Sequence, residues 1–191
     1  MSNLFNKKKD IINWLEKYEV KNYTLIKDRE YGYVVDVEGY VNLYDKKLSK
    51  IKVKFNHIQG HFLCGLNKLQ SLEGAPNIVD GNFYCEHNQI ISLEGSPKEV
   101  FGNFYCSYNK LTSLQGSPQI IKGNFVCNNN QLNSLKGAPQ EVGKKFYCHN
   151  NPQLGIYQKM TNFNEIKTLL EKDNLSNNLI IPEIHSIIHK L

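Results

Sequence analysis

The chain has 191 residues, 40% of them hydrophobic, and a formal net charge of +5, values that fit one domain and exclude a polycation. No apolar stretch approaches the roughly 20 residues that a membrane-spanning helix needs. The apolar pair Leu4-Phe5 precedes the basic run at 7–9, which is the reverse of the order in a secretion signal. We therefore expect a soluble, cytoplasmic protein.

Residues 1–38 predict an N-terminal helical cap. Apolar residues at helical spacing, among them Ile11, Trp14 and Leu15, predict an amphipathic helix that covers the first coil of the downstream repeats. Residues 39–59 resemble a degraded copy of the downstream repeat. This copy has Lys46 in place of the repeat asparagine and lacks the proline, as an end coil that seals a core can do.

A period of 21 residues runs through the centre of the chain. The consensus is Gly-x-Phe-x-Cys-x-x-Asn-x-Leu-x-Ser-Leu-x-Gly-(Ala/Ser)-Pro. An unbroken period of this kind is typical of a solenoid, which we place at residues 39–154. The period is marked by the cysteines Cys64, Cys85, Cys106, Cys127 and Cys148.

Each copy of the repeat predicts one short strand followed by a turn. Phe and Cys alternate with variable residues, so both are expected to point inward. The asparagine three residues after each Cys is expected to bond the backbone of the neighbouring coil, so that stacked amides form a ladder. The Gly-(Ala/Ser)-Pro segment predicts a turn, and because Gly and Pro recur in every copy we expect no helix between the strands. The ladder asparagines are Asn67, Asn88, Asn109, Asn130 and Asn151.

Residues 155–191 predict a C-terminal helical cap. Asn162 and Glu165 have the form of a capping box, and Pro182 is placed to open a last helix. That helix would carry His185 and His189, whose spacing is that of a two-histidine metal pair. No acidic residue lies between them and no third ligand is evident, so we favour an exposed stripe on the helix.

The repeat resembles the leucine-rich repeat, because Phe-x-Cys-x-x-Asn-x-Leu matches the signature Leu-x-Leu-x-x-Asn-x-Leu with two leucines replaced. Its length and its Leu-x-Gly-Ala-Pro segment are most similar to the short bacterial subtype, and the chain is also similar to small repeat proteins of phages and mobile elements. The resemblance covers roughly residues 37–154. It implies an α/β-type solenoid, a right-handed coil with a parallel sheet whose concave face binds another macromolecule, and it does not imply catalysis.

The cysteine column has a metal or redox interpretation and a structural one. Zinc needs ligands that converge tetrahedrally on one point, whereas stacked coils place the thiols along a line with a spacing of about 4.8 Å. Buried Cys packs as a small hydrophobic residue. An odd number of cysteines at strand positions is also unlike a disulfide framework. We predict free, structural thiols.

The variable strand positions are the strongest candidates for a binding site. Tyrosine is enriched in interface hot spots, and a patch of tyrosines with few charges resembles the core of an interface. Stacked tyrosines on adjacent strands can also simply support each other, and both interpretations can hold together. The candidate protein-binding residues are Tyr84, Glu86, His87, Tyr105, Ser107, Tyr108, Asn128, Tyr147 and His149.

A basic cluster in the first coil suggests a different partner. Nucleic acid is the alternative ligand for such a cluster, although a solvated face is the ordinary explanation of a charge run. Arg29 is the only arginine of the chain, whereas readers of bases and phosphates favour the guanidinium fork. The cluster consists of Lys46, Lys47, Lys50, Lys52 and Lys54.

Together these features predict a non-catalytic protein-binding module without a cofactor. No arrangement of Ser, His and Asp, no phosphate-binding glycine loop and no carboxylate pair can be placed in the sequence. From the resemblance to phage proteins we expect an inhibitor of a bacterial defence complex, such as a CRISPR effector. The alternatives are binding of nucleic acid or a ribonucleoprotein through the lysine cluster and, less favoured without an export signal, a bacterial housekeeping or surface adhesin-type repeat protein.

Overall fold

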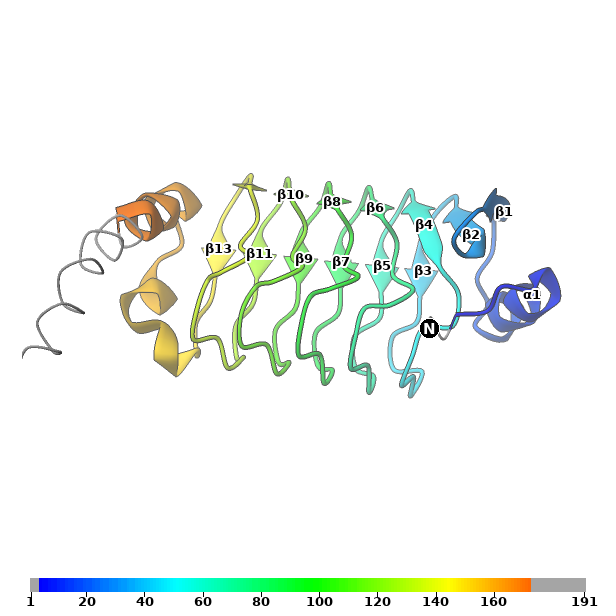
Figure 1. Ribbon diagram of the computed structural model, residues 1–191, viewed down its shortest axis with the longest axis horizontal. Helices are drawn as coiled ribbons and strands as arrows, with labels where there is room; N and C mark the ends of the chain where they lie inside the picture. The colour runs from blue at the N-terminus through cyan, green and yellow to red at the C-terminus, as the bar shows by residue number, and fades with distance from the viewer. Residues whose placement is uncertain (1–3, 173–191) are drawn as a thin grey trace, which may run out of the picture.

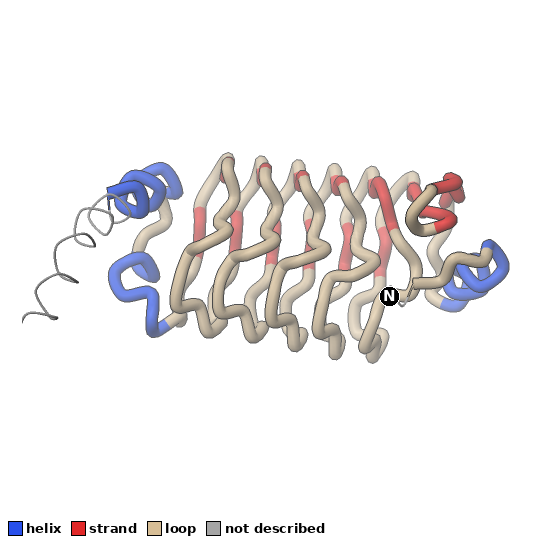
Figure 2. The backbone as a smooth tube through the Cα atoms, in the orientation of Figure 1, coloured by secondary structure: helices blue, strands red, loops and turns tan. Residues whose placement is uncertain are grey.

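A computed structural model of the chain describes residues 4–172. The chain winds into a β-solenoid of about five turns, with two parallel sheets along its length (Figure 1). A helix lies at the N-terminal end of the solenoid, and residues 163–172 form a helix at the other end. The coils themselves contain strands and loops without helix (Figure 2), so the α/β-type fold expected for the solenoid is corrected to an all-β one.

The first sheet, which we call the aromatic sheet, contains the predicted strands. Neighbouring strands are parallel and in register at 21 residues, with Phe62 opposite Phe83 and Phe83 opposite Phe104. The six strands are β3 (Val41–Asn42), β5 (Phe62–Leu63), β7 (Phe83–Tyr84), β9 (Phe104–Tyr105), β11 (Phe125–Val126) and β13 (Phe146–Tyr147).

The second sheet, the aliphatic sheet, is not predicted by the sequence pattern. Its solenoid strands are mostly two residues long and lack the alternating Phe-x-Cys pattern that marks the strands of the aromatic sheet. Three of them bury one Val or Ile each, namely Val79, Val100 and Ile121. The seven strands are β1 (Tyr23–Asp28), β2 (Gly32–Val37), β4 (Phe55–Ile58), β6 (Ile78–Val79), β8 (Glu99–Val100), β10 (Ile120–Ile121) and β12 (Glu141–Val142).

A glycine turns the corner between the two sheets in every coil except the last, which has Lys144 at this position. A Cβ on Gly102 would lie 2.6 Å from the carbonyl oxygen of Gly81 in the preceding coil. The backbone amide of Gly102 donates to that same oxygen, so the coils approach too closely there for any side chain. This close approach explains the glycine that opens each repeat.

A column of phenylalanine rings fills the solenoid from end to end. The rings of Phe62 and Phe83 stack with centroids 5.5 Å apart, and those of Phe83 and Phe104 stack at 5.1 Å. Trp14 contacts the first ring, Phe55, and Phe163 contacts the last, Phe146. Helical residues therefore contact both ends of the core.

The predicted asparagine ladder is confirmed. The side chain of Asn109 is buried, its Oδ1 accepts the amide of Ile90 at 3.0 Å, and its Nδ2 donates to the carbonyls of Cys85 and Cys106 at 3.0 and 3.1 Å. Asn88 and the other ladder asparagines repeat this pattern with their own neighbours. Each amide thus satisfies backbone groups of two coils that water cannot reach.

Replacing one ladder asparagine is expected to destabilise the whole solenoid. Asn109→Ala removes all these bonds at once and leaves buried backbone groups unpaired, so we expect a loss of about 3 kcal/mol in the free energy of unfolding, measured by urea denaturation. The control is Asn103→Ala, whose partly buried amide accepts the backbone N–H of Asn124, a bond that water can replace. Equal losses in the two variants would contradict the ladder as a main stabilising element.

The predicted cap at residues 1–38 is only partly helical. The helix α1 (Lys8–Lys17) buries Ile11, Trp14 and Leu15, as predicted. After it, β1 and β2 form an antiparallel hairpin, and β2 pairs in parallel with β4. The predicted helical cap is therefore corrected to a mixed one, because β2 buries Val34, Val35 and Val37 in a strand that extends the aliphatic sheet.

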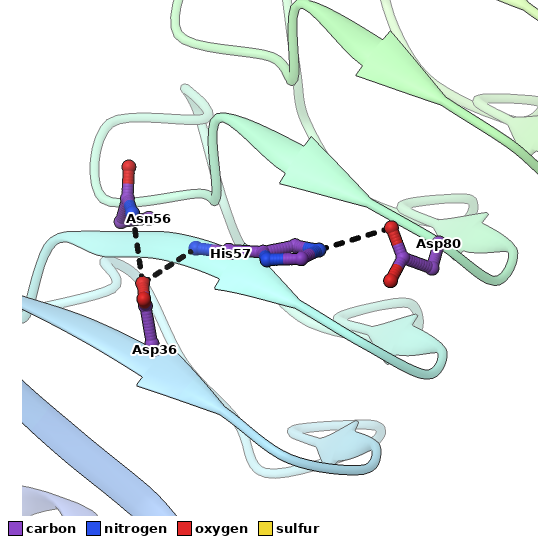
Figure 3. Close-up of polar contacts among 4 residues, drawn as sticks. All are labelled: Asp36, Asn56, His57 and Asp80. Atoms are coloured by element: carbon purple, nitrogen blue, oxygen red, sulfur yellow. Dashed lines mark hydrogen bonds and ion pairs between the residues drawn. The ribbon is translucent and has the colours of Figure 1, made fainter.

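A polar cluster fixes this hairpin to the first coils (Figure 3). Asp36 Oδ1 accepts from Asn56 Nδ2 at 2.8 Å and from the backbone amide of His57 at 3.1 Å. His57 Nε2 lies 3.0 Å from Asp80 Oδ1. The cluster lies where the register between β2 and β4 shifts. Its bonds connect β2, β4 and the residue after β6, which are neighbours in the aliphatic sheet.

Beyond β13 the chain turns back across the end of the aromatic sheet. The 3₁₀ segment η1 (Pro152–Lys159) leads to Thr161, whose carbonyl accepts the amide of Phe146. Asn162 Oδ1 accepts the amide of Asn164 at 3.0 Å and so caps the following helix, as its place in the predicted capping box suggested. The predicted last helix, with Pro182, His185 and His189, lies outside the described residues.

Candidate protein-binding surface

The outer face of the aromatic sheet gathers side chains from adjacent coils into one patch. Residues that alternate with the buried Phe and Cys point outward, and the equal length of the coils places equivalent positions side by side. We call the central patch, on β7, β9 and the turns that follow them, the tyrosine surface. It consists of Tyr84, Glu86, His87, Tyr105, Ser107 and Tyr108.

Two stacked tyrosines form the first row of the tyrosine surface. The rings of Tyr84 and Tyr105 are almost parallel, at an interplanar angle of 7°, with centroids 4.8 Å apart. Asn82 Nδ2 donates to the hydroxyl of Tyr84 at 2.8 Å and fixes its position. Burial and the neighbouring Tyr84 raise the pKa of Tyr105. Stacking and the bond from Asn82 therefore preorganise both rings, and the raised pKa keeps Tyr105 neutral near pH 7.

A second aromatic stack stands at the turn after the strands. His87 and Tyr108 stack with centroids 4.3 Å apart and an interplanar angle of 8°, and Tyr108 is 51% exposed. Both residues have a positive φ, 54° and 55°, at the point where the chain leaves the strand. This uncommon backbone conformation for a non-glycine residue recurs in every coil, and it holds exposed side chains in a row along one edge of the sheet.

Glu86 is the one carboxylate of the tyrosine surface, between the two aromatic stacks. Its Oε2 is buried and has no hydrogen-bond partner among the described residues. Burial raises the pKa of this carboxyl. Ser107 in the next coil is buried, and its Oγ donates to the carbonyl of Val126 at 3.4 Å. It therefore affects the shape of the surface and does not present an exposed polar group there.

The remaining predicted residues lie toward the C-terminal end of the sheet. Asn128 Oδ1 accepts the backbone amide of His149 at 2.8 Å, and His149 Nδ1 lies 2.8 Å from the carbonyl of Gln158. The ring of His149 also contacts Tyr147 at 5.8 Å. These side chains anchor the returning segment, and Val126 separates Tyr147 from the stacked tyrosines. The structure thus brings six of the nine predicted residues together on two coils. Asn128 follows on the next coil, where its carbonyl accepts the amide of Tyr108, and Tyr147 and His149 lie one coil further.

Sequence reasoning missed Tyr44 as a neighbour of this surface. A Cβ on Gly65 would lie 3.1 Å from both the Tyr44 ring and Glu86 Oε1, so the tyrosine approaches the carboxylate across the glycine. Tyr44 is 39% exposed. A signal for it is present, because Tyr44 stands 21 residues before Gly65 in the column that contains Glu86, but the degraded consensus of the first coil hides it.

The structure does not bring the predicted lysine cluster into one exposed patch. Lys46, Lys47 and Lys50 are exposed, while Lys52 Nζ lies over the ring of Phe5 at 5.9 Å. Lys54 is buried and donates to the carbonyl of Ala75, so it is not available at the surface cluster. The prediction that Lys54 belongs to an exposed basic cluster is therefore corrected, because its side chain extends toward Ala75 of the next coil.

The cysteines are buried in a line along the core, all of them as free thiols. Burial raises their pKa, in Cys148 to about 12, and the Cys85 and Cys127 thiols donate to carbonyls of the next coil at 3.3 Å. Within residues 4–172, no three His, Cys, Asp or Glu side chains are placed to hold one metal ion. The same residues include no helix long and apolar enough to cross a membrane.

Comparison with known proteins adds no relative to these observations. No protein-family model, no curated protein and no solved structure matches the chain.

Replacing Glu86 tests the electrostatics of the tyrosine surface. Burial raises the pKa of this carboxyl in the folded state above its unfolded value, so its ionisation destabilises the fold as pH rises above the ordinary range near 4.3. Because Glu86 is only partly buried, Glu86→Gln should stabilise the protein at pH 7 by roughly 1 kcal/mol or less, and by nothing near pH 3. Thermal unfolding at both pH values measures the difference.

Glu94→Gln, an exposed position on the same coil, is the control and should leave stability unchanged at both pH values. A destabilised Glu86→Gln variant at pH 7 would contradict the assignment of Glu86 as an incompletely satisfied carboxylate.

Proposed function

We propose that the protein is a non-catalytic binding module that docks a protein partner through the tyrosine surface. The observation that carries the proposal is the pair of parallel ring stacks, Tyr84 on Tyr105 and His87 on Tyr108, on two adjacent coils. Rigid aromatic side chains supply contact area at a low cost in conformational entropy, and they are enriched in interface hot spots. With one carboxylate among them, these residues have the composition of an interface core.

The finer identity of the repeat is also a proposal. We infer that the coil is a variant leucine-rich repeat, supported by the buried asparagine that follows each strand and by the two inward positions before it. The resemblance to small phage proteins further suggests a cytoplasmic inhibitor of a bacterial defence complex, such as a CRISPR effector. A compact solenoid suits stoichiometric blocking, because it offers one long surface on a rigid scaffold.

Replacing the stacked tyrosines is expected to abolish partner binding without unfolding the chain. In Tyr84→Ala/Tyr105→Ala the buried Phe and Cys of each strand remain, so the fold should persist, while loss of a hot-spot pair should weaken binding by a factor of at least about 30. Capture of partners from a bacterial lysate by tagged wild-type and variant proteins, read by mass spectrometry, measures the loss.

The control is Phe101→Ala, which removes an aromatic side chain that is 48% exposed next to the aliphatic sheet. Capture should be lost in the double variant and retained in the control. Equal capture by a folded double variant would rule out the tyrosine surface. Captured partners that disappear after nuclease treatment, or whose affinity falls steeply with salt, would instead assign the function to nucleic acid and to the exposed lysines of the first coil.

The inhibitor proposal has its own test in living cells. Expression of the wild-type protein in bacteria that carry an active CRISPR effector should restore plaque formation by a targeted phage, and the Tyr84→Ala/Tyr105→Ala variant should not. Plaque counts unchanged by the wild-type protein across the effector types tested would contradict inhibition of these effectors and leave the binding proposal to the capture experiment.

A further inference from the structure

Lys54 is a buried amine with few hydrogen-bond partners. It occupies the position in the first coil that Ala75 and Ser96 occupy in the next two, each 21 residues further along the chain. Ser96 bonds the carbonyl of Gly116, and Lys54 Nζ in the same way donates to the carbonyl of Ala75 at 2.5 Å. An ammonium group has three donors, and among the described residues this carbonyl is the one acceptor that Nζ reaches.

Lys54 lines a surface cavity of about 440 Å³. The cavity lies between the turn that joins β1 and β2, which contributes Glu30 and Tyr31, and the turns of the next coils, which contribute Glu73 and Glu94. Its volume is in the range of small-molecule sites. Lys54 is the one amine among the residues that line it, and none of these residues belongs to the tyrosine surface.

The surroundings of Lys54 favour the neutral amine. Burial lowers its pKa to about 8, and the positive charge of Lys98 acts in the same direction, while Glu30 opposes the shift. At pH 7.5 roughly a quarter of such an amine is unprotonated, compared with about one part in a thousand for an ordinary lysine. A neutral, buried lysine amine is the nucleophile that forms Schiff bases in proteins.

We propose that this cavity binds a small neutral carbonyl compound, an aldehyde or ketone, which Lys54 holds reversibly as an imine. The lone pair of Nζ attacks the carbonyl carbon, and the oxygen takes a proton to give a carbinolamine. The C–O bond then breaks, water leaves with the second proton lost from Nζ, and the C=N bond forms. Amine and carbonyl compound thus become imine and water, with no oxidant or reductant.

The charges around the cavity select the class of ligand. Glu30, Glu73 and Glu94 line it together with the single cation of Lys54. A protonated imine keeps one positive charge, which the carboxylate of Glu30 stabilises. An anionic carbonyl compound would add a negative charge among three carboxylates, so a 2-oxo acid is disfavoured.

Reductive trapping tests the proposal on the unmodified protein. Propionaldehyde and sodium cyanoborohydride, at pH values from 6 to 10, convert any imine to a stable secondary amine that peptide mapping by mass spectrometry locates. At pH 7.5 we expect Lys54 to be labelled about tenfold faster than exposed Lys47, because its larger neutral fraction outweighs its lower basicity. Labelling of Lys54 should not increase further above pH about 8, where this amine is mostly neutral.

Two comparisons complete the experiment. With glyoxylate in place of propionaldehyde, the preference for Lys54 over Lys47 should fall by at least about fivefold. In Lys54→Arg, which keeps the charge and a donor toward Ala75, labelling should stop at this position and stay unchanged at Lys47. Labelling of Lys54 no faster than Lys47 at every pH, or an equal preference with glyoxylate, would overturn the proposal. Either result is independent of the tyrosine surface, because partner capture needs no residue of this cavity.

Discussion

The buried side-chain amide between consecutive coils is the constraint on which the rest of the structure depends. A coil of 21 residues closes with strands of two residues, so its sheets alone leave many backbone groups without partners. Asn109 and its equivalents satisfy these groups by accepting from one coil and donating to two carbonyls. Each asparagine side chain must contact the same backbone atoms in the neighbouring coil. Inserting or deleting one residue in a coil would therefore break the ladder. The strict period of the sequence follows from this geometry.

That regularity also explains why the outer surface can carry specific chemistry. Because the register is constant, equivalent positions of successive coils lie in straight rows. Aromatic residues, Tyr or His, at the same position of two adjacent coils therefore stack on each other. The scaffold supplies the spacing of about 4.8 Å that strands have, and it keeps the rings rigid. Function therefore resides in the positions that the ladder leaves free. Glu86, whose buried Oε2 has no hydrogen-bond partner among the described residues, is the feature that distinguishes the central coils from their neighbours.

The first coil is where the consensus ends and different chemistry begins. Without the Gly-(Ala/Ser)-Pro turn, it places Lys54 where the later coils have a small residue, and this lysine is both buried and among the residues that line a cavity. The hairpin of β1 and β2 extends the aliphatic sheet and supplies Glu30 to that cavity. An end coil contacts a different neighbour on one side. Its sequence can therefore depart from the consensus that the interior coils share.

The sequence by itself determined the solenoid, its period, the inward Phe and Cys columns and the asparagine ladder, because all of these are local patterns repeated at a fixed spacing. It also placed Tyr84, Tyr105 and Tyr108 on the outside. The aliphatic sheet, the β1–β2 hairpin and the burial of Lys54 were decided only by the tertiary structure. The strands of the aliphatic sheet lack the alternating Phe-x-Cys pattern that marks the aromatic sheet, and the burial of a lysine depends on which carbonyl of the next coil lies opposite it. Contacts between coils, unlike the pattern within one coil, exist only once the chain has closed.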